Sequence, residues 1–279
     1  MERVRKTIPE ARDRAQSRAL AWVVGALLAW FAVALVIATR RLGLPLRTLR
    51  IPLGFSAVFA VLVLRLRAAT PAAAAMGFLV CFILAQSPLA WGRYVAVSAP
   101  THALSALIAV FVLTYATTRF GRKKKEARGL AEPRQGRRAS QIVANLGAAA
   151  LFAAAGRYEG CIAALAEAAA DTVSSEIGQA VGGEALLVTS WKRVPAGTDG
   201  GTTIVGTVAG LVAGAVVAAL GAMHQGLWPG VMKVWMASCV GLFFDSVLGA
   251  TLERRGWLGN DWVNFCSTVV AGLVAMVLG

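Results

Sequence analysis

Apolar residues fall into long runs separated by short polar segments, a pattern typical of helices that cross a membrane. A bilayer needs roughly 20 residues of helix, and the second run reaches this only if Pro52 and Arg65 lie at the two interfaces. Four runs occupy the first part of the chain and three close it. They cover residues 22–37, 51–66, 72–89, 103–118, 204–223, 231–252 and 262–278.

The segment between these two groups has a weaker pattern. Residues 142–170 are rich in Ala, only weakly hydrophobic, and interrupted by Arg157 and Glu159. They predict either two short helices in a hairpin or one span followed by a re-entrant piece. A polar link over residues 189–203 follows. The expected fold is therefore all-α, a polytopic transmembrane helical bundle of about seven to nine membrane helices, with re-entrant or short helices around 142–170.

The composition agrees with a membrane protein. Hydrophobic residues make up 57% of the 279 residues and charged residues only 15%, so a soluble domain would expose too much apolar surface. Only helices and closed barrels satisfy backbone polar groups in lipid, and these runs are too long and uniformly apolar for barrel strands. We expect an integral membrane protein surrounded by lipid, in a bacterial plasma membrane or a plastid membrane.

The charge is strongly basic and unevenly distributed. The formal net charge is +14, and no acidic residue occurs between Asp13 and Glu126. Most of the basic residues in that stretch border apolar runs, which favours contact with anionic lipid, and no nucleic acid partner is expected. The positive-inside rule places the basic loop 119–141 in the cytoplasm. The chain then divides into a basic cytoplasmic segment (1–18), a four-helix membrane region (19–118) and a membrane region with the candidate catalytic site (119–279).

Two carboxylates, those of Asp171 and Asp245, interrupt apolar stretches. A carboxylate at the centre of a membrane helix costs roughly 2.5–3.5 kcal/mol on insertion scales, so a polar role in a protein-lined cavity is expected. With loop 119–141 in the cytoplasm, counting the crossings brings these two residues to the same membrane face as Asp199 and Asp261. The sequence therefore predicts a single site at that face.

Helical spacing places further groups beside these carboxylates. Asp171 and Ser175 share a helix face at i, i+4 spacing, for which a solvated helix end is the alternative. Gly241 and Gly249 flank Asp245 at the same spacing and leave a groove for a phosphate or a neighbouring backbone. Close packing of small residues explains the two glycines as well, but not the Asp.

A glycine-rich turn lies just before the first of the closing helices. Residues 195–203 read Pro-Ala-Gly-Thr-Asp-Gly-Gly-Thr-Thr, and Lys192 precedes them. Such a turn can form a nest of backbone N–H groups for an anion, and a plain turn with a helix N-cap is the alternative. Carboxylates, basic residues and this turn at one membrane face suit a magnesium–phosphate complex, in which carboxylate oxygens hold the metal.

Five motifs occur in an order that resembles one family. They occupy residues 136–145, 170–178, 195–206, 245–252 and 263–264. They resemble the integral-membrane family that contains the phytyl-phosphate kinase of tocopherol biosynthesis and transmembrane protein 19, most closely from Thr114 onward. Val173 stands where that family often has Trp, and Asp199 stands where it often has Asn.

The resemblance implies a phosphotransferase that converts a prenyl monophosphate, phytyl or geranylgeranyl phosphate, to the diphosphate. The implied donor is a nucleoside triphosphate, CTP, and the implied cofactor is Mg²⁺. The implied catalytic residues are Asp171, Glu176 and Asp245, which would hold the metal together with Asp199. Contacts to nucleotide or phosphate are implied for Arg137, Arg138, Asn145, Ser175, Lys192, Gly197, Thr198, Gly200, Gly201 and Asn264.

Other functions are compatible with the same residues. A prenyl-alcohol kinase or a CTP-dependent cytidylyltransferase would use a similar metal site, although an alcohol acceptor needs a base near its hydroxyl. A membrane transporter also uses acids within the membrane, but the two halves show no convincing repeat. The sequence does not indicate an oligomeric state.

Overall fold

Helices make up most of the structure. The computed structural model describes residues 8–41, 43, 49–90, 98–131, 135–181 and 183–278. Residues 1–7 of the predicted N-terminal segment and 132–134 of the basic loop lie outside this description. The N-terminal helices are α1 (Glu10–Arg41), α2 (Arg50–Arg65), α3 (Pro71–Ala90), α4 (Ser98–Arg119) and the short α5 (Arg122–Ala127).

The C-terminal half contains the remaining helices and a small sheet. The helices are α6 (Ala139–Ala154), α7 (Tyr158–Val181), α8 (Ile204–Ala222), α9 (Met232–Leu248) and α10 (Asn260–Val277). Short helical turns join or extend them: η2 (Met223–Gln225), η3 (Gly226–Val231) and η4 (Gly249–Glu253). The strands are β1 (Glu184–Leu187), β2 (Arg193–Pro195) and β3 (Gly201–Thr202).

Several of these helices are suited to a bilayer. Four described stretches are long and apolar enough to cross it, namely Glu10–Arg41, His102–Arg119, Ile204–Glu253 and Asn260–Val277. Their outer faces carry exposed large apolar side chains such as Trp22 and Val212, as expected for contact with lipid. The predicted polytopic helical bundle is confirmed.

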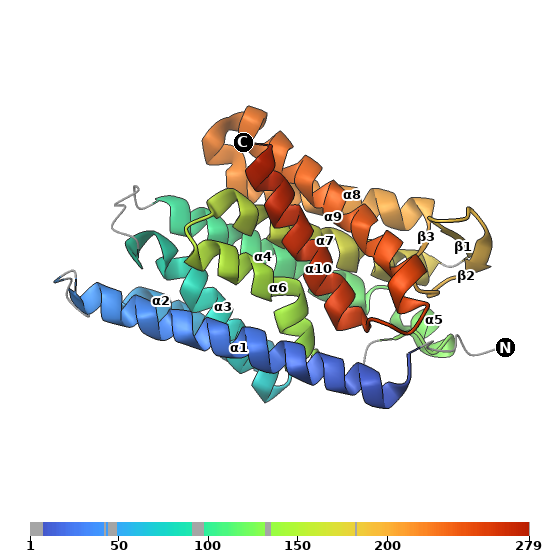
Figure 1. Ribbon diagram of the computed structural model, residues 1–279, viewed down its shortest axis with the longest axis horizontal. Helices are drawn as coiled ribbons and strands as arrows, with labels where there is room; N and C mark the ends of the chain where they lie inside the picture. Colours follow the sequence, from blue (N-terminus) through green and yellow to red (C-terminus); the bar gives the residue numbers. More distant parts are fainter. Residues whose placement is uncertain are drawn as a thin grey trace.

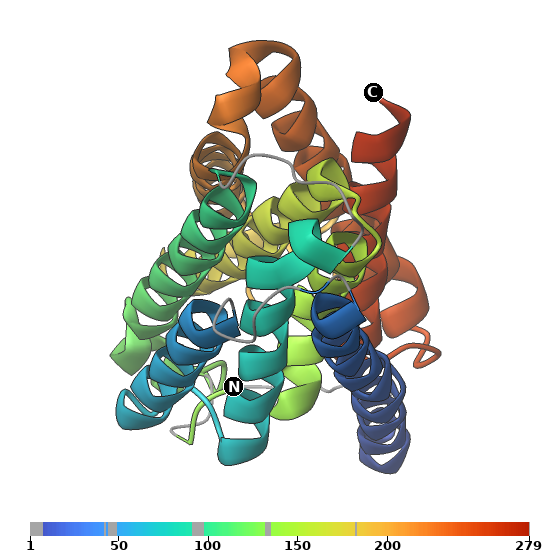
Figure 2. The ribbon, with the colours of Figure 1, turned by 90° about the vertical axis from the view of Figure 1, so that its left-hand side faces the viewer.

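Helix α7 is the central element of the bundle in both ribbon views (Figure 1 and Figure 2). It packs against α4, α6, α8, α9 and α10, and most of its residues are buried. Its sequence is Ala-rich with scattered acids, so its low hydropathy reflects enclosure by protein rather than by lipid. Of the two alternatives for residues 142–170, the structure agrees with two helices, but the second is not short: α7 has 24 residues and continues past Asp171 to Val181.

The polar link before α8 folds into a three-stranded antiparallel sheet in the order β2-β1-β3. Ala185 pairs with Val194 and Leu186 pairs with Thr202. Ala185 and Leu187 are buried, whereas the other residues of β1 are more exposed, which is the alternation of a strand with one covered face. The fold therefore differs from the all-α expectation by this small sheet, which lies at the end of the bundle that also carries α5 (Figure 1).

Glycines bring α8 unusually close to α7. Gly206, Gly210 and Gly214 recur every four residues, and a Cβ atom at Gly210 would lie 2.5 Å from the carbonyl oxygen of Ala170. Small residues at this spacing allow helix backbones to approach in membranes. This contact holds α8 along the wall that presents Asp171.

We expect Gly210→Ala to destabilise the protein by about 1–3 kcal/mol, because the new methyl group overpacks the α7–α8 contact. Gly54→Ala in α2 is the matched control, since a Cβ atom there meets nothing within 4 Å. Replacing a helical Gly by Ala removes a backbone entropy cost, so this control should melt at an equal or higher temperature. Thermal unfolding in detergent measures both, and equal melting of the two variants would contradict the close packing.

An ion pair with a buried lysine lies near each end of α7. Near its N-terminal end Glu159 pairs with Lys233 of α9, and near its C-terminal end Glu176 pairs with Lys125 of α5. Lys125 is fully buried, and its Nζ also donates to the carbonyl oxygens of Thr117 (3.1 Å) and Thr118 (2.9 Å). The basic loop is thereby attached to the core of the bundle.

Candidate functional site

A polar cavity of about 350 Å³ opens at the end of the bundle that carries the sheet. Its walls come from α6, α7, α9 and α10, and the turn 196–200 together with β3 covers it. The four acidic residues that the sequence assigned to one membrane face all line it: Asp171, Asp199, Asp245 and Asp261. The structure therefore brings together groups that lie up to 90 positions apart in the chain.

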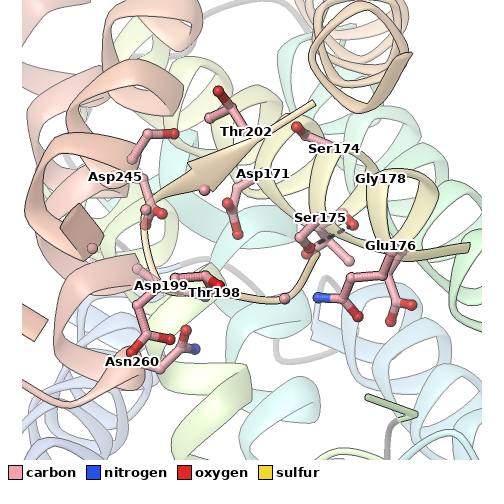
Figure 3. Close-up of a pocket in the computed structure, with 18 of the residues that line it drawn as sticks. Asp171, Ser174, Ser175, Glu176, Gly178, Thr198, Asp199, Thr202, Asp245 and Asn260 are labelled. Atoms are coloured by element: carbon pink, nitrogen blue, oxygen red, sulfur yellow. Dashed lines mark hydrogen bonds between the residues drawn. The ribbon is translucent and has the colours of Figure 1, made fainter. Parts of the chain in front are cut away.

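Asp171 and Asp245 face this cavity from two helices. Figure 3 shows their carboxylates directed into the space between α7 and α9. They are close enough to repel each other electrostatically, and one oxygen of Asp245, Oδ2, is buried without a hydrogen-bond partner. A buried acceptor without a partner is costly unless a ligand or cation completes it. The pair is therefore suited to bind something positively charged.

Close helix packing at Gly241 sets the position of Asp245. A Cβ atom at Gly241 would lie 2.6 Å from Cγ of Glu167 and 2.8 Å from Cβ of Ala271. Gly249 in turn lies against Gly200 of the covering turn. A Cβ atom at Gly249 would lie 2.7 Å from the backbone nitrogen of Gly200. Both glycines are therefore explained by close packing. These contacts place Asp245 between α7, α10 and the turn.

Other oxygen donors surround these two carboxylates. Asn145 of α6 donates from Nδ2 to the carbonyl oxygen of Gln141 (2.8 Å), which leaves its Oδ1 buried without a partner. Oδ2 of Asp261 is also buried without one, and Asn264 lines the same wall. Among the described lining residues the basic side chain is that of Arg137, whose charge acts on Asp171.

Hard oxygen ligands are what Mg²⁺ prefers, and this cavity offers several. Within the described part of the chain, no three His, Cys, Asp or Glu side chains lie close enough to hold a metal by themselves. Mg²⁺ is usually held by one or two carboxylates, water and substrate phosphates rather than by an all-protein cage. Asp171, Asp245 and the partnerless oxygen atoms therefore fit a metal that arrives with a phosphate ligand.

Glu176 and Ser175 lie at the far side of the cavity (Figure 3). The Glu176 carboxylate pairs with Lys125, so a metal at this position would have to compete with that lysine. Ser175 is exposed and donates its hydroxyl hydrogen to the carbonyl oxygen of Thr172 (3.1 Å). Both residues face the cavity, but the structure gives Glu176 a partner that the sequence did not indicate.

The glycine-rich turn lines the cavity through Gly197, Thr198, Gly200 and Gly201. The backbone N–H of Thr198 donates to Pro195 (3.2 Å) and that of Gly201 donates to Thr198 (2.9 Å), so these two amides are used within the turn. Gly200 has φ of +70°, and any Cβ atom there would collide with the backbone of Ala250. Gly200 is thus required by the turn and by its contact with η4.

Two predicted phosphate contacts lie away from the cavity. Arg138 and Lys192 are exposed and do not line it. The backbone N–H of Arg138 donates to Oε1 of Gln141 (2.8 Å) at the start of α6. Neighbouring positions in a motif point in different directions, and here only Arg137 faces the site.

Several lining residues were absent from the predicted set. Glu253 continues the four-residue spacing of Gly241, Asp245 and Gly249, which is a signal that the sequence contains. Asn260 begins α10 directly before Asp261, at a helix start where polar residues are common. The remaining ones are short hydroxyl side chains without a sequence signature: Ser174, Thr202, Thr203 and Ser246.

A helical bundle with membrane-length apolar helices and a carboxylate-rich cavity at one end defines an integral membrane protein with a polar binding site. The sequence model of one family, described as "Integral membrane protein DUF92", matches residues 54–272. The chain belongs to this family, and the resemblance seen in its motifs is confirmed.

Relatives of the chain come from distant organisms. An uncharacterized membrane protein of Synechocystis is 32% identical over 208 residues, covering 70% of this chain and 76% of the relative. One from Methanocaldococcus jannaschii is 32% identical over 181 residues, covering 63% and 75%. Protein VTE6, chloroplastic, from Arabidopsis thaliana is 29% identical over 187 residues, covering 61% and 56%. No solved structure matches the chain.

Proposed function

We propose that this protein is a membrane phosphotransferase that converts a prenyl monophosphate to the diphosphate, with CTP as the phosphoryl donor. The ordered motifs resemble the family that contains a phytyl-phosphate kinase, and the similarity to the chloroplast protein VTE6 supports the same direction. The observation that carries the proposal is the polar cavity in which Asp171 and Asp245 meet beside Arg137 at one end of the bundle.

The chemistry of a prenyl phosphate suits this location. Its hydrocarbon tail partitions into lipid while its phosphate stays near the interface, where the cavity opens. An oxygen of the acceptor phosphate forms a bond to the γ-phosphorus of the donor, and the bond from that phosphorus to the β-phosphate oxygen breaks, releasing a nucleoside diphosphate. The acceptor oxygen is already anionic, so no general base is required.

Positioning and charge neutralisation would then supply most of the rate enhancement. Asp171 and Asp245 would hold Mg²⁺, with Asp199 at the edge of the same space. A metal held there would supply positive charge to offset that of the phosphates. Arg137 would contribute a positive charge for the phosphates, and Asn145 and Asn264 would hydrogen-bond the nucleotide or orient ligands.

The test is to follow each phosphate of the donor with purified protein. We expect label from the γ-position of CTP to appear in a lipid diphosphate, and removal of Mg²⁺ by EDTA to stop transfer until the metal is restored. Transfer of α-label to lipid would instead identify a cytidylyltransferase. Phosphorylation of phytol in place of phytyl phosphate would identify an alcohol kinase. Substrate flux into proteoliposomes without nucleotide consumption would identify a transporter.

A further inference from the structure

A second cavity, of about 640 Å³, lies beside the first between α2, α3, α4 and α6. Its inner part is apolar, lined by side chains such as Val63, Leu107 and Leu146. Phe59 and Phe111 form part of its wall, packed edge to face with 5.2 Å between their ring centroids. Its volume falls within the range of about 300–1,000 Å³ that holds ligands of moderate size. The cavity is thus large and apolar enough for a hydrocarbon chain.

One end of this cavity is strongly basic. It lies where α2 and α4 end and α5 begins, and its cationic residues are Arg67, Arg119, Arg122, Lys123 and Arg137. The acidic residue among its described lining is Glu126, which pairs with Arg122 (3.0 Å). An apolar chamber with a cationic end matches a molecule with a long hydrocarbon tail and an anionic head.

Contacts with the protein orient Arg119 at this end. Its guanidinium stacks over the ring of Tyr115, 3.6 Å from the centroid, and donates to the carbonyl oxygen of Leu66 (3.1 Å). Nearby, Arg67 has a φ of +51°, a backbone conformation that is uncommon for residues other than Gly. The basic end is therefore a built feature of the fold and more than a set of exposed, mobile side chains.

The two cavities meet at two shared residues. Arg137 and Asn145 line both, because Arg137 lies just before α6 and Asn145 lies within α6, which packs against α3 and α7. A head group at the basic end of the second cavity would therefore lie next to the carboxylates of the first. These two cavities could therefore hold a donor and an acceptor side by side.

We propose that the second cavity is the chamber for the isoprenoid chain of the acceptor, with the acceptor phosphate at the Arg137 end and the nucleotide in the first cavity. This inference rests on the proposed function for the identity of the chain. In this arrangement the two substrates lie on opposite sides of Arg137. The acceptor phosphate and the γ-phosphate of the donor then both lie next to this residue.

Gly77 of α3 offers a direct way to fill the chamber. It lines the cavity, and a Cβ atom there meets nothing within 4 Å, so Gly77→Phe would project into open space. The matched control is Gly54→Phe in α2, which also meets nothing within 4 Å but does not line the cavity. Gly77→Met is a smaller step that keeps the test valid if the Phe variant folds poorly, as judged by thermal unfolding.

The first measurement needs no turnover. We expect radiolabelled hexadecyl phosphate to bind to the purified wild type and Gly77→Phe to weaken this binding by at least about tenfold, in line with the discrimination a filled apolar pocket gives. Gly77→Met should show a smaller loss, and Gly54→Phe should stay within about twofold of the wild type. Equal binding by the wild type and Gly77→Phe, or no binding by the wild type, would overturn the chamber.

The second measurement separates the chamber from the proposed reaction. With geranyl and geranylgeranyl phosphate as acceptors, Gly77→Phe should lose activity on the longer chain by about tenfold more than on the shorter one. A wild type that binds hexadecyl phosphate but transfers no γ-phosphate to any acceptor would reject the kinase while supporting the chamber. Competition by hexadecanol as strong as by hexadecyl phosphate would contradict a phosphate at the basic end.

Discussion

Asp171→Asn should lower turnover by on the order of 10³-fold, as expected when a group preorganised for the charge of the transition state is lost. The substitution keeps the shape of the side chain but removes the charge that would hold Mg²⁺. It also removes a negative charge that acts on Asp245, so the folded protein should melt at the same or a higher temperature. Lower activity without lower stability would separate function from folding.

The measurement is the γ-phosphate transfer assay together with thermal unfolding in detergent. Glu184→Gln is the control, since Glu184 is an exposed strand residue that pairs with Arg193 (2.9 Å) and does not line the cavity. We expect it to retain wild-type activity, because exposed ion pairs contribute little. Near-normal turnover by Asp171→Asn would reject this carboxylate as a metal ligand.

Lys125→Met should destabilise the protein by about 3–5 kcal/mol, the usual result of breaking a buried ion pair from one side. The substitution leaves the Glu176 carboxylate buried without its partner and removes the donor to the carbonyl oxygens of Thr117 and Thr118. Because Lys125 lies in the basic loop, we expect α5 to detach from α7, and limited proteolysis in this loop to become faster.

The double variant Lys125→Met with Glu176→Gln provides the matching test. It replaces the charged pair by neutral groups of similar size, which often costs little compared with leaving one charge unpaired. We therefore expect it to recover most of the melting temperature lost in the single variant. If Lys125→Met alone melts like the wild type, or if the double variant melts lower still, the pair does not act as described.

The apolar runs predicted most of the fold. Their limits agree with α1, α4, α8 and α10 to within a few residues at most ends, apart from the polar N-terminal part of α1, because long uniform hydrophobicity is a strong local signal. Helix α7 was not predicted as one continuous helix, since enclosure by protein lets it carry Glu167 and Asp171 in a weakly hydrophobic sequence. The sheet was missed because its strands are four residues or shorter.

The candidate site was predictable where it depends on topology. Counting crossings placed Asp171, Asp199 and Asp245 at one face, and the structure brings them to one cavity. The pairing of Glu176 with Lys125 could not be predicted, because it joins a loop and a helix 51 positions apart. The direction of each side chain could not be predicted from the sequence either. Arg138 was therefore grouped with Arg137, although only Arg137 reaches the cavity. The metal and the nucleotide stay predictions.

The charge pairs at the two ends of α7 also govern how the site responds to its membrane. A helix held only by lipid adjusts its tilt or depth when bilayer thickness changes. Here Glu159 and Glu176 attach α7 to Lys233 and Lys125, so its height is set by neighbouring protein. Thickness changes would act first on lipid-facing helices such as α1, leaving the polar cavity at a constant depth from one host membrane to another.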